Sequence, residues 1–449
     1  MRKRRFFALL AVFAALSLVA AACGDDEDGG EETGGGETGT TTAPTGPAAD
    51  CDADPFGCVE IAAGEPIKIA SLLAISGDVA FLGTDSANGI LLAIDNLDGA
   101  LDATPGQLLG HDVTLQQEDD GCSAEGGQAG GTALAADPSV VAVIGTSCSS
   151  SALGVADTIL GDKGILLFSP SNTNPGLTSE EAHQPFYART AHNDKIQGAI
   201  VAEFALSDLG AKTSATINDE SPYADGLAAA YRANFEAGGG SITAIEQINS
   251  ADTDFGPLLT SIAEGDPDVL YFPDFNPACA LIAQQAADIM PDTTLIGSDG
   301  CLETSFLETA GDAAEGVYAS SPDVTVFQSG AFYADEFLPA YAEQFGTEPT
   351  SVFHAHAFDA SNVLFDAIEA VAVDDGSGNL TIPRTALKDA VFATSGYEGI
   401  TGIITCTPLG DCATDVTIGI FQAPAWPVEG GTPDAESVYS DTKSLDEVI

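Results

Sequence analysis

Two patterns that predict the fold class lie next to each other in residues 68–97, KIASLLAISGDVAFLGTDSANGILLAIDNL. Residues 68–75 are an almost continuous apolar run, which is typical of a strand covered on both faces in a parallel sheet. From 87 to 97 the large apolar residues recur at helical spacing, with Ile90 and Ile94 on one side. A buried strand followed by an amphipathic helix is one βα unit.

Strand-like and helix-like segments alternate along most of the chain. Further strands are predicted at 113–117, 140–144 and 165–168, with helices at 124–136 and from about 150. Past Arg189 the alternation restarts, with helices at 195–209, 223–236, 255–263 and from Pro277, and strands at 213–217, 242–248, 269–272 and 295–297. Repeated βα units predict an α/β fold with two Rossmann-like lobes, each built on an open sheet. Ligands of such sheets bind at the carboxyl ends of the strands, so we expect a site in the cleft between the lobes.

The N-terminus is typical of an exported protein. Residues 2–5 are basic, and residues 6–22 carry no charge before Cys23. A membrane-spanning helix needs roughly 20 apolar residues with no processing site behind it, so residues 1–22 are predicted to be a signal peptide. Residues 20–23, Ala-Ala-Ala-Cys, resemble a bacterial lipobox, whose cysteine carries the lipid of the mature protein. The lipobox prefers Leu where Ala20 stands, and simple cleavage after the alanines is the alternative.

The composition excludes some classes of partner. The chain has 13 Lys and Arg against 68 Asp and Glu, which gives a formal charge of −55. Nucleic acid and anionic membrane surfaces bind basic patches, so we expect no nucleic acid partner and membrane contact only through the lipid anchor. Residues 23–50 are acidic and rich in Gly and Thr, which predicts a flexible tether, and residues 428–449 are predicted to be a loose acidic tail.

Nine cysteines are an odd number for an exported protein. If Cys23 carries lipid, the remaining eight fall into near-neighbour couples, for which an oxidising compartment permits disulfides. The predicted bridges are Cys51–Cys58, Cys122–Cys148, Cys279–Cys301 and Cys406–Cys412. A zinc site is the alternative, but the sequence has no CxxC pair and no Cys/His cluster at ligand spacing. His354 and His356, at i and i+2, do not face one site on a helix. We therefore expect no metal and no cofactor.

A serine-rich turn, residues 145–151, joins a predicted buried strand to a helix. A hydrolase nucleophile elbow needs Gly-x-Ser-x-Gly, and Ser149 stands where the second glycine belongs. Free N–H groups and hydroxyls at a helix start can instead bind a carboxylate. An ordinary serine helix cap, worth about 1 kcal/mol, explains the residues equally well.

Other polar and aromatic residues follow the carboxyl ends of predicted strands. Residues 169–175 form a donor-rich loop that is pinned by two prolines, and Asp299 follows a strand of the second lobe. Tyr223 and Phe275 stand at equivalent edges, where they can wall a small ligand. Taken singly, each has a plainer explanation, as a polar turn, a turn Asp beside glycine, or a core aromatic residue.

Together these motifs resemble the Leu/Ile/Val-binding proteins of ABC transporters, which have the type I periplasmic binding fold. The resemblance covers about residues 66–425. The motifs that carry it are Ser76-Gly77, Asp119-Asp120 before Cys122, Ile144 through Ser151, Ser169 through Pro175, Tyr223 through Gly226, Gly297 through Gly300, and Glu315-Gly316. It implies three crossovers, near 189, 321 and 402. The lobes are then 66–188 with 323–401 and 189–322 with 402–427, preceded by a small disulfide-bearing segment at 51–65.

The resemblance also assigns roles to individual residues. Ser149 would bind the ligand carboxylate with its hydroxyl and N–H, next to Cys148. Thr173 would donate its N–H to the same carboxylate and accept from the ammonium together with the Ser171 carbonyl. Asp299 would pair with the ammonium, and Tyr223 would close the cleft.

Three positions depart from the family pattern. Phe275 lacks the hydroxyl of the Tyr found in some members, Leu82 stands where an aromatic residue often contacts the ligand side chain, and Asp299 replaces a longer Glu. We expect a monomeric, lipid-anchored protein on the outer face of the cell membrane. We expect a binding protein rather than an enzyme, one that captures a small zwitterionic amino acid, branched-chain or otherwise apolar, and delivers it to an ABC permease. An amide or urea receptor or a sensor of the same fold is the alternative, and a secreted serine hydrolase is a distant one, since no His lies near Ser149 in sequence.

Overall fold

The computed structural model describes residues 51–327, 331–426 and 437–449. The predicted signal peptide, Cys23 and the tether lie outside the described residues. Within the described ranges no helix has both the length and the apolar character to cross a membrane. The described chain forms two lobes, each built around one large sheet.

The first lobe has a six-stranded sheet in the order β3-β4-β2-β5-β6-β7, in which only the β3–β4 pair is antiparallel. Its strands are β2 (Ile67–Leu73), β3 (Gln107–Leu108), β4 (His111–Asp119), β5 (Val140–Gly145), β6 (Leu166–Ser169) and β7 (Tyr187–Arg189). Its helices are α1 (Ala80–Asp95), α2 (Ala124–Ala135), α3 (Ser149–Val155), α10 (Leu338–Phe345), α11 (Phe353–Val371) and α12 (Arg384–Phe392).

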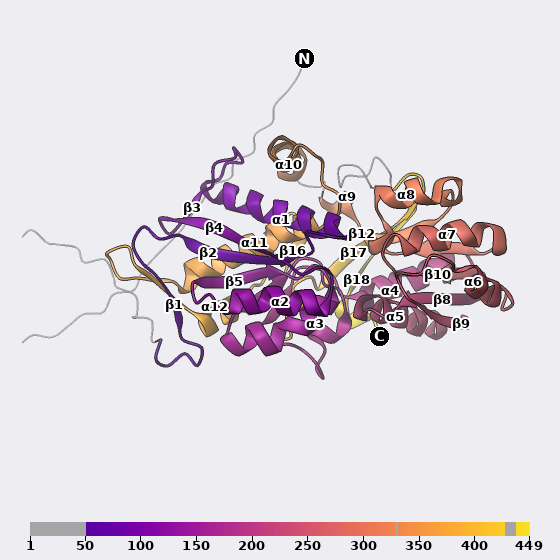
Figure 1. Ribbon diagram of the computed structural model, residues 1–449, viewed down its shortest axis with the longest axis horizontal. Helices are drawn as coiled ribbons and strands as arrows, with labels where there is room; N and C mark the ends of the chain where they lie inside the picture. Colours follow the sequence, from indigo (N-terminus) through magenta and orange to yellow (C-terminus); the bar gives the residue numbers. More distant parts are fainter. Residues whose placement is uncertain (1–50, 328–330, 427–436) are drawn as a thin grey trace, which may run out of the picture. The chain divides into compact units, whose positions relative to one another are not determined.

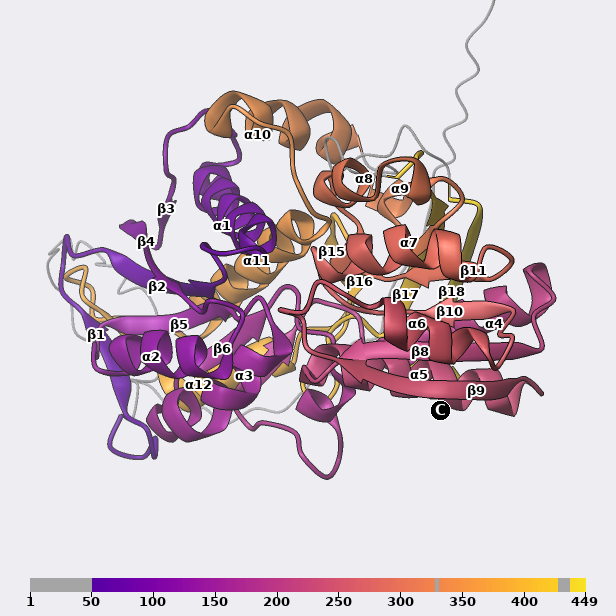
Figure 2. The same ribbon diagram turned by 45° about the vertical axis from the view of Figure 1, so that its right-hand side comes forward.

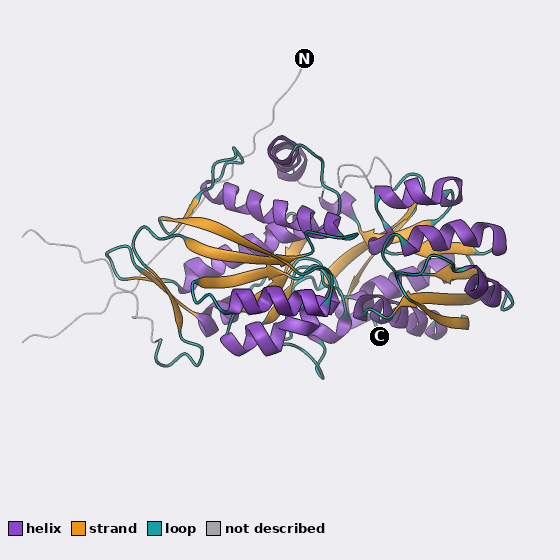
Figure 3. Ribbon diagram, viewed as in Figure 1, coloured by secondary structure: helices purple, strands orange, loops and turns teal. Residues whose placement is uncertain are grey.

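Strand β2 shows why the sheet is covered on both faces. Ile67, Ile69 and Leu73 belong to the apolar cluster under α1 and α11, whereas Ala70 and Leu72 belong to the cluster under α2 and α3. Side chains alternate across a strand, so a continuous apolar run supplies both clusters at once. Figures 1 and 3 show α1 on one side of this sheet and α2 and α3 on the other. The predicted buried strand is confirmed.

The second lobe has a seven-stranded sheet in the order β18-β17-β12-β11-β10-β8-β9, parallel from β12 to β9. Its strands are β8 (Thr213–Asp219), β9 (Ser241–Ile248), β10 (Val269–Tyr271), β11 (Thr294–Gly297), β12 (Tyr318–Pro322), β17 (Asp415–Gln422) and β18 (Tyr439–Ser444). Its helices are α4 (Asp194–Glu203), α5 (Pro222–Ala237), α6 (Gly256–Ala263), α7 (Ala278–Ile289) and α8 (Thr304–Ala310). Strand β10 turns Tyr271 toward the α4 and α5 side and Leu270 toward the α6 and α7 side. Figure 2 shows α6 and α7 on one face of this sheet and α5 on the other.

Smaller elements complete the described chain. They are β1 (Cys58–Ile61), α9 (Val324–Phe327), β13 (Val373–Asp374), β14 (Leu380–Pro383), β15 (Tyr397–Gly399) and β16 (Gly402–Ile404). Single 3-10 or π turns are η1 (Asn96–Asp98), η2 (Ala156–Leu160), η3 (Gly161–Lys163), η4 (Pro175–Thr178), η5 (Phe204–Asp208), η6 (Asp299–Cys301), η7 (Gly311–Ala314), η8 (Tyr333–Phe337) and η9 (Leu445–Glu447).

Three boundaries differ from those expected. The tail prediction is wrong for 439–444, which form β18 and pair with β17. The segment 51–65 is part of the first lobe, because β1 pairs with β14 and Val59 is in the core of that lobe. Ile404 and Cys412 also belong to that core, so the third crossover lies after Cys412 rather than at 402. The hydrophobicity of Val59, Ile404 and Cys412 is consistent with burial, but it does not indicate which sheet they pack against.

All four predicted disulfides are present, namely Cys51–Cys58, Cys122–Cys148, Cys279–Cys301 and Cys406–Cys412. Two of them brace loops at the carboxyl ends of strands. Cys122–Cys148 joins the turn after β4 to the residue before α3, and Cys279–Cys301 joins α7 to η6, where Asp299 lies. The loops that border the cleft are therefore cross-linked rather than free.

Candidate functional site

A cavity of about 280 Å³ lies where the carboxyl ends of strands from both lobes meet. Four predicted site residues line it, Cys148 and Ser149 from the first lobe and Tyr223 and Phe275 from the second. The other lining residues are Asp78, Val79, Gly121, Cys122, Ser150, Asp219, Ser221, Ser250, Asn276 and Pro277. The position agrees with the expectation for two open α/β sheets.

The turn between β5 and α3 is held by buried hydrogen bonds. The Ser147 N–H donates to Asp120 Oδ2 at 2.8 Å, and the Cys122 N–H donates to Asp120 Oδ1 at 2.7 Å. The Ala74 N–H donates to the Ser147 hydroxyl at 3.0 Å. Burial raises the pKa of Asp120 to about 6 despite these N–H donors. This network fixes the turn that places Ser149, two residues after Ser147, at the cavity.

The loop after β6 packs against the same turn. The Ser171 hydroxyl donates to the Ser147 carbonyl at 2.9 Å, and the Asn174 N–H donates to the Ser149 hydroxyl at 3.3 Å. Arg189 holds this loop in place, because its Nη1 donates hydrogen bonds to the carbonyls of Asn172 and Asn174 at 3.1 and 2.9 Å. The first lobe thus offers hydroxyls and N–H groups in a rigid setting.

Arg189 is itself completely buried and paired with an acid from a distant part of the chain. Its Nε lies 2.6 Å from Asp411 Oδ1, and its Nη2 donates to the Thr178 hydroxyl at 2.6 Å. This charge is therefore committed to holding the loop. A ligand carboxylate would meet hydroxyl and amide donors rather than the guanidinium.

The second lobe presents a carboxylate. Asp299 Oδ1 accepts from the Gln197 amide at 2.8 Å and from the Tyr223 hydroxyl at 3.1 Å. Tyr223 also contacts the Ser298 hydroxyl at 2.8 Å, and its ring lies 5.0 Å from that of Phe275. Both donors to Asp299 are neutral. Among the described residues no Lys or Arg forms an ion pair with Asp299.

A second acid, Asp194, connects Asp299 with the loop of the first lobe. Its N–H donates to the Thr173 carbonyl at 3.0 Å. Burial first, and the neighbouring charge of Asp299 second, hold the pKa of the Asp194 carboxyl well above its usual range. The Asp194 carboxyl and the Thr173 hydroxyl are both buried, and each is the side-chain hydrogen-bond partner of the other.

The sequence did not single out Gln197 or Asp194 as site residues. Asp194 is the first residue of α4, directly after the stretch 190–193, and Gln197 lies three residues further along that helix. His192 Nε2 donates to the Gln197 amide oxygen at 2.5 Å, which orients the Gln197 nitrogen toward Asp299. Burial lowers the pKa of His192, so its ring is the neutral donor in this chain of hydrogen bonds.

Not every predicted residue reaches the cavity. Leu82 is 4% exposed and lies in the core of the first lobe, while Val79, nearly one helical turn earlier, lines the cavity instead. Ser171, Thr173 and Asp299 do not line it: Ser171 is hydrogen-bonded to Ser147, Thr173 to Asp194, and Asp299 to the cavity residue Tyr223.

The hydrolase alternative required a base for Ser147 or Ser149, with His354 as the available candidate. His354 is completely buried between α1 and α10. Its Nδ1 lies 3.0 Å from Asp85 Oδ2 and its Nε2 lies 2.8 Å from the Tyr333 hydroxyl. The His354 ring thus serves the packing of the first lobe and is not a base for the serines.

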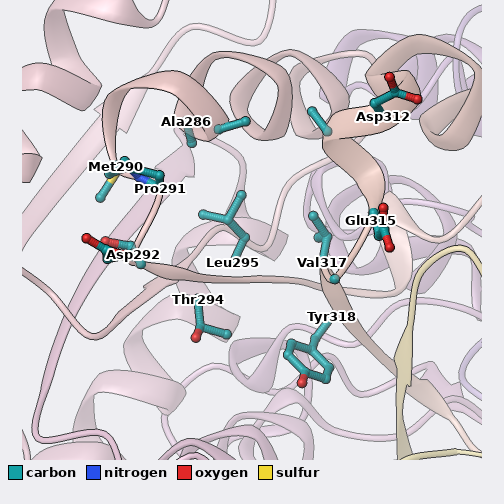
Figure 4. A pocket seen from close by; sticks show the side chains of 14 residues that line it. Ala286, Met290, Pro291, Asp292, Thr294, Leu295, Asp312, Glu315, Val317 and Tyr318 are labelled. Atoms are coloured by element: carbon teal, nitrogen blue, oxygen red, sulfur yellow. The ribbon is translucent and has the colours of Figure 1, made fainter.

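A larger cavity, about 390 Å³, lies at the opposite end of the second lobe. Figure 4 shows two of its lining residues, Leu295 and Val317, between Met290 on one side and Glu315 on the other. These residues stand at the amino ends of β11 and β12 and after α7. Because ligands of open α/β sheets bind at the carboxyl ends, the smaller cavity is the candidate site.

Comparison with known proteins agrees with this geometry. A family model described as periplasmic binding protein matches residues 66–415. The Leu/Ile/Val-binding protein BraC3 of Rhizobium johnstonii is 30% identical over 325 residues, which cover 72% of this chain and 83% of that protein. A leucine-, isoleucine-, valine-, threonine- and alanine-binding protein of Pseudomonas aeruginosa is 29% identical, over 70% of this chain and 80% of its own length.

Solved structures are similar along the same part of the chain. The leucine binding protein LivK of Thermotoga maritima superposes with a TM-score of 0.71 at 26% identity, covering 85% of this chain and 100% of that one. LivJ of Streptococcus pneumoniae, solved with isoleucine, gives a TM-score of 0.68 at 26% identity, covering 84% and 99%. The type I periplasmic binding fold predicted from the sequence is confirmed.

Proposed function

The chain belongs to the periplasmic binding protein family, and from this premise we propose that it captures a small α-amino acid between its lobes and delivers it to an ABC permease. Its relatives are named for branched-chain amino acids, and one of the similar structures was solved with isoleucine. Leucine, isoleucine and valine are therefore the first ligands to test.

The observation that carries this proposal is the opposite chemistry of the two lobes where they meet, at the cavity and behind its lining residues. The first lobe offers the Ser149 hydroxyl and N–H and the neighbouring loop around Thr173. The second lobe offers Asp299, which only neutral groups contact through hydrogen bonds among the described residues. An α-amino acid carries a carboxylate and an ammonium on one carbon, so it would satisfy both borders at once.

Ligand binding would also close the protein. An amino acid contacts donors of one lobe and the acid of the other, so it binds the closed arrangement more tightly than the open one. That differential affinity drives closure about the three crossovers. The Asn174 side-chain amide already donates to the Pro222 carbonyl of the second lobe at 2.5 Å, which is a contact that closure would use.

Export and anchoring belong to the same proposal. Residues 1–22 direct export, the lipid on Cys23 holds the protein at the outer face of the cell membrane, and the acidic tether lets the two lobes reach the permease. The protein acts as a monomer. Labelling with a radioactive fatty acid in a bacterial host, with Cys23→Ala as the control, tests the anchor separately from ligand binding.

Calorimetry of the folded protein against the twenty amino acids, urea, short amides and γ-aminobutyrate tests the central claim. We expect micromolar or tighter binding of at least one α-amino acid, with no binding of its N-acetyl or amide derivative because each removes one of the two charges. A folded protein that binds none of these compounds contradicts the proposal. Preference for urea or an amide over every amino acid favours a receptor of the other solute class.

A further inference from the structure

Two completely buried side chains, Gln197 and His192, form a chain of hydrogen bonds that ends on the Asp299 carboxylate. We propose that Gln197, oriented by His192, is a specificity-determining residue, because it holds Asp299 with a neutral amide and leaves the carboxylate charge for a ligand ammonium. The protein would thereby select α-amino acids against the α-hydroxy and α-keto acids of the same carbon skeleton. This inference rests on the proposed function, since it assumes that the ligand ammonium meets Asp299.

The direction of the hydrogen bonds in this chain is fixed by its end. A carboxylate only accepts, so the Gln197 atom that lies 2.8 Å from Asp299 Oδ1 is the amide nitrogen. The same nitrogen donates its second N–H to the Ser320 hydroxyl at 2.9 Å. The amide oxygen then faces His192 Nε2 at 2.5 Å and accepts its N–H. Turning the amide over would place its oxygen against the Asp299 carboxylate, and the bond from His192 prevents this.

Both protein donors to Asp299 reach the same oxygen. Gln197 and the Tyr223 hydroxyl, the latter at 3.1 Å, donate to Oδ1. Asp299 is partly exposed, and its Oδ2, which accepts no hydrogen bond from the described residues, is not one of the buried polar atoms. This second oxygen is therefore open to a donor that a ligand brings. A carboxylate with one open oxygen and only neutral donors suits an ammonium.

The neighbouring acid Asp194 does not add to this negative charge. Its carboxyl is completely buried and is paired with the Thr173 hydroxyl. Burial first, and the charge of Asp299 second, hold the pKa of Asp194 well above its usual range, so this carboxyl is protonated. One negative charge remains, at Asp299, and it matches the single ammonium of an α-amino acid. A hydroxy acid or keto acid would leave that charge without a cation.

Calorimetry with leucine and 2-hydroxy-4-methylpentanoate tests the inference, since the two share the carboxylate and the side chain and differ only in ammonium against hydroxyl. We expect the wild-type protein to bind leucine at least about 10-fold more tightly than the hydroxy acid. Gln197→Lys should reduce this preference about 5- to 10-fold, because the introduced cation pairs with Asp299 in place of the ligand. Circular dichroism checks that the variant is folded.

Gln197→Glu is the matched variant, because Glu has the size and shape of Gln. Two carboxyl groups at 2.8 Å share one proton, so the pair with Asp299 keeps one negative charge. This variant should therefore keep the preference for leucine to within about 2-fold. A residue that serves only packing would tolerate Glu and Lys without any effect on the ratio, or would lose binding of both ligands in both variants.

Two further controls separate the charge at the site from other effects. Gln284→Lys makes the same change of charge at an exposed position of α7, in the same lobe, and should leave the preference unchanged. His192→Phe should lower the preference about 2- to 3-fold, since the Gln197 amide is then free to turn. His356→Phe removes another buried histidine, which is bonded to the Thr190 carbonyl near the same crossover, and should not change the preference.

Each other result has one meaning. If leucine binds and Gln197→Lys keeps the wild-type preference, the inference is wrong and the proposed function stands. Equal loss of the preference in Gln197→Lys and Gln197→Glu also overturns it. If Gln197→Lys does not fold, an unchanged preference in His192→Phe overturns it instead. If the wild-type protein binds the hydroxy acid as tightly as leucine, Asp299 does not select an ammonium and the inference fails. If the folded protein binds no α-amino acid, the proposed function fails as well.

Discussion

The two borders of the cavity differ in how far their polar groups are already satisfied. In the first lobe, Ser147, Ser171 and Asp120 are bonded to one another or to nearby N–H groups, and Arg189 holds the loop beneath them. In the second lobe, Asp299 receives only neutral donors and forms no ion pair with a Lys or Arg of the described chain.

The two lobes therefore contribute differently to ligand binding. The polar groups of the first lobe are already held by hydrogen bonds, so this lobe can position a ligand carboxylate without rearranging. The second lobe presents the Asp299 carboxylate, which has only neutral donors, so its contribution to binding depends on the ammonium that a ligand brings. Neither border can satisfy both charges of an amino acid. Binding therefore requires the two lobes together, and the following predictions test each border separately.

The largest expected effect is on the stability of the first lobe, where Arg189 holds the loop beside the cavity. Arg189→Met should lower the free energy of unfolding by about 3–5 kcal/mol, because it leaves the Asp411 charge buried without its partner. Urea unfolding followed by circular dichroism measures it. Arg189→Met combined with Asp411→Leu should recover part of the loss. A single variant as stable as wild type would show that Arg189 does not hold the loop.

The second effect is on the pH dependence of the free energy of unfolding. Burial raises the pKa of Asp120 to about 6, above the value of an unfolded Asp, so the proton on this carboxyl stabilises the folded state. That contribution is complete below about pH 4 and is lost as the pH rises through 6, by up to about 3 kcal/mol. Urea unfolding of wild type and Asp120→Asn from pH 4 to 7 should show a shallower pH dependence in the variant. Parallel curves would mean that Asp120 titrates normally.

A third prediction concerns the contribution of Asp299, in the second lobe, to ligand affinity. Asp299→Asn should weaken amino acid binding by about 1–3 kcal/mol, because a charge-assisted hydrogen bond to the ammonium becomes a neutral one. Calorimetry measures the affinity, with Asp312→Asn as the control, since Asp312 is an exposed acid of the same lobe near the opposite end. Unchanged affinity in the Asp299 variant removes this residue from the site.

The smallest expected effect is on the ligand affinity that Ser149 of the first lobe contributes. Ser149→Ala should weaken binding by about 1 kcal/mol through loss of one neutral donor to the carboxylate. Ser150→Ala is the matched control, because Ser150 also lines the cavity but its hydroxyl donates to the Cys122 carbonyl at 3.1 Å. Equal losses in the two variants would indicate a general effect on the turn rather than a contact of Ser149 with the ligand.

Much of the fold could be predicted because its signals are local. The run at 68–75 and the helical spacing after it depend on neighbours within a few residues, and the disulfide couples are close in sequence. The start of α1 at Ala80 was missed. Its first turns contain Gly83, which approaches the Ala74 carbonyl too closely for a side chain, and Asp85, which accepts from the Thr350 N–H and the Ser351 hydroxyl. Those partners are far away in the sequence and leave no periodic signal.

The sequence alone determined the alternation of strands and helices, the two lobes and the loops at the carboxyl ends of strands. The reason is that a buried strand and a half-buried helix each require a characteristic spacing of apolar residues along the chain. Only the tertiary structure decided that Leu82 points into the core, that 439–444 adds an edge strand, and that Asp194 lies near Asp299. The physical reason is that the environment of a buried charge or an edge strand is made by segments distant in sequence. Such an environment exists only once both lobes have folded.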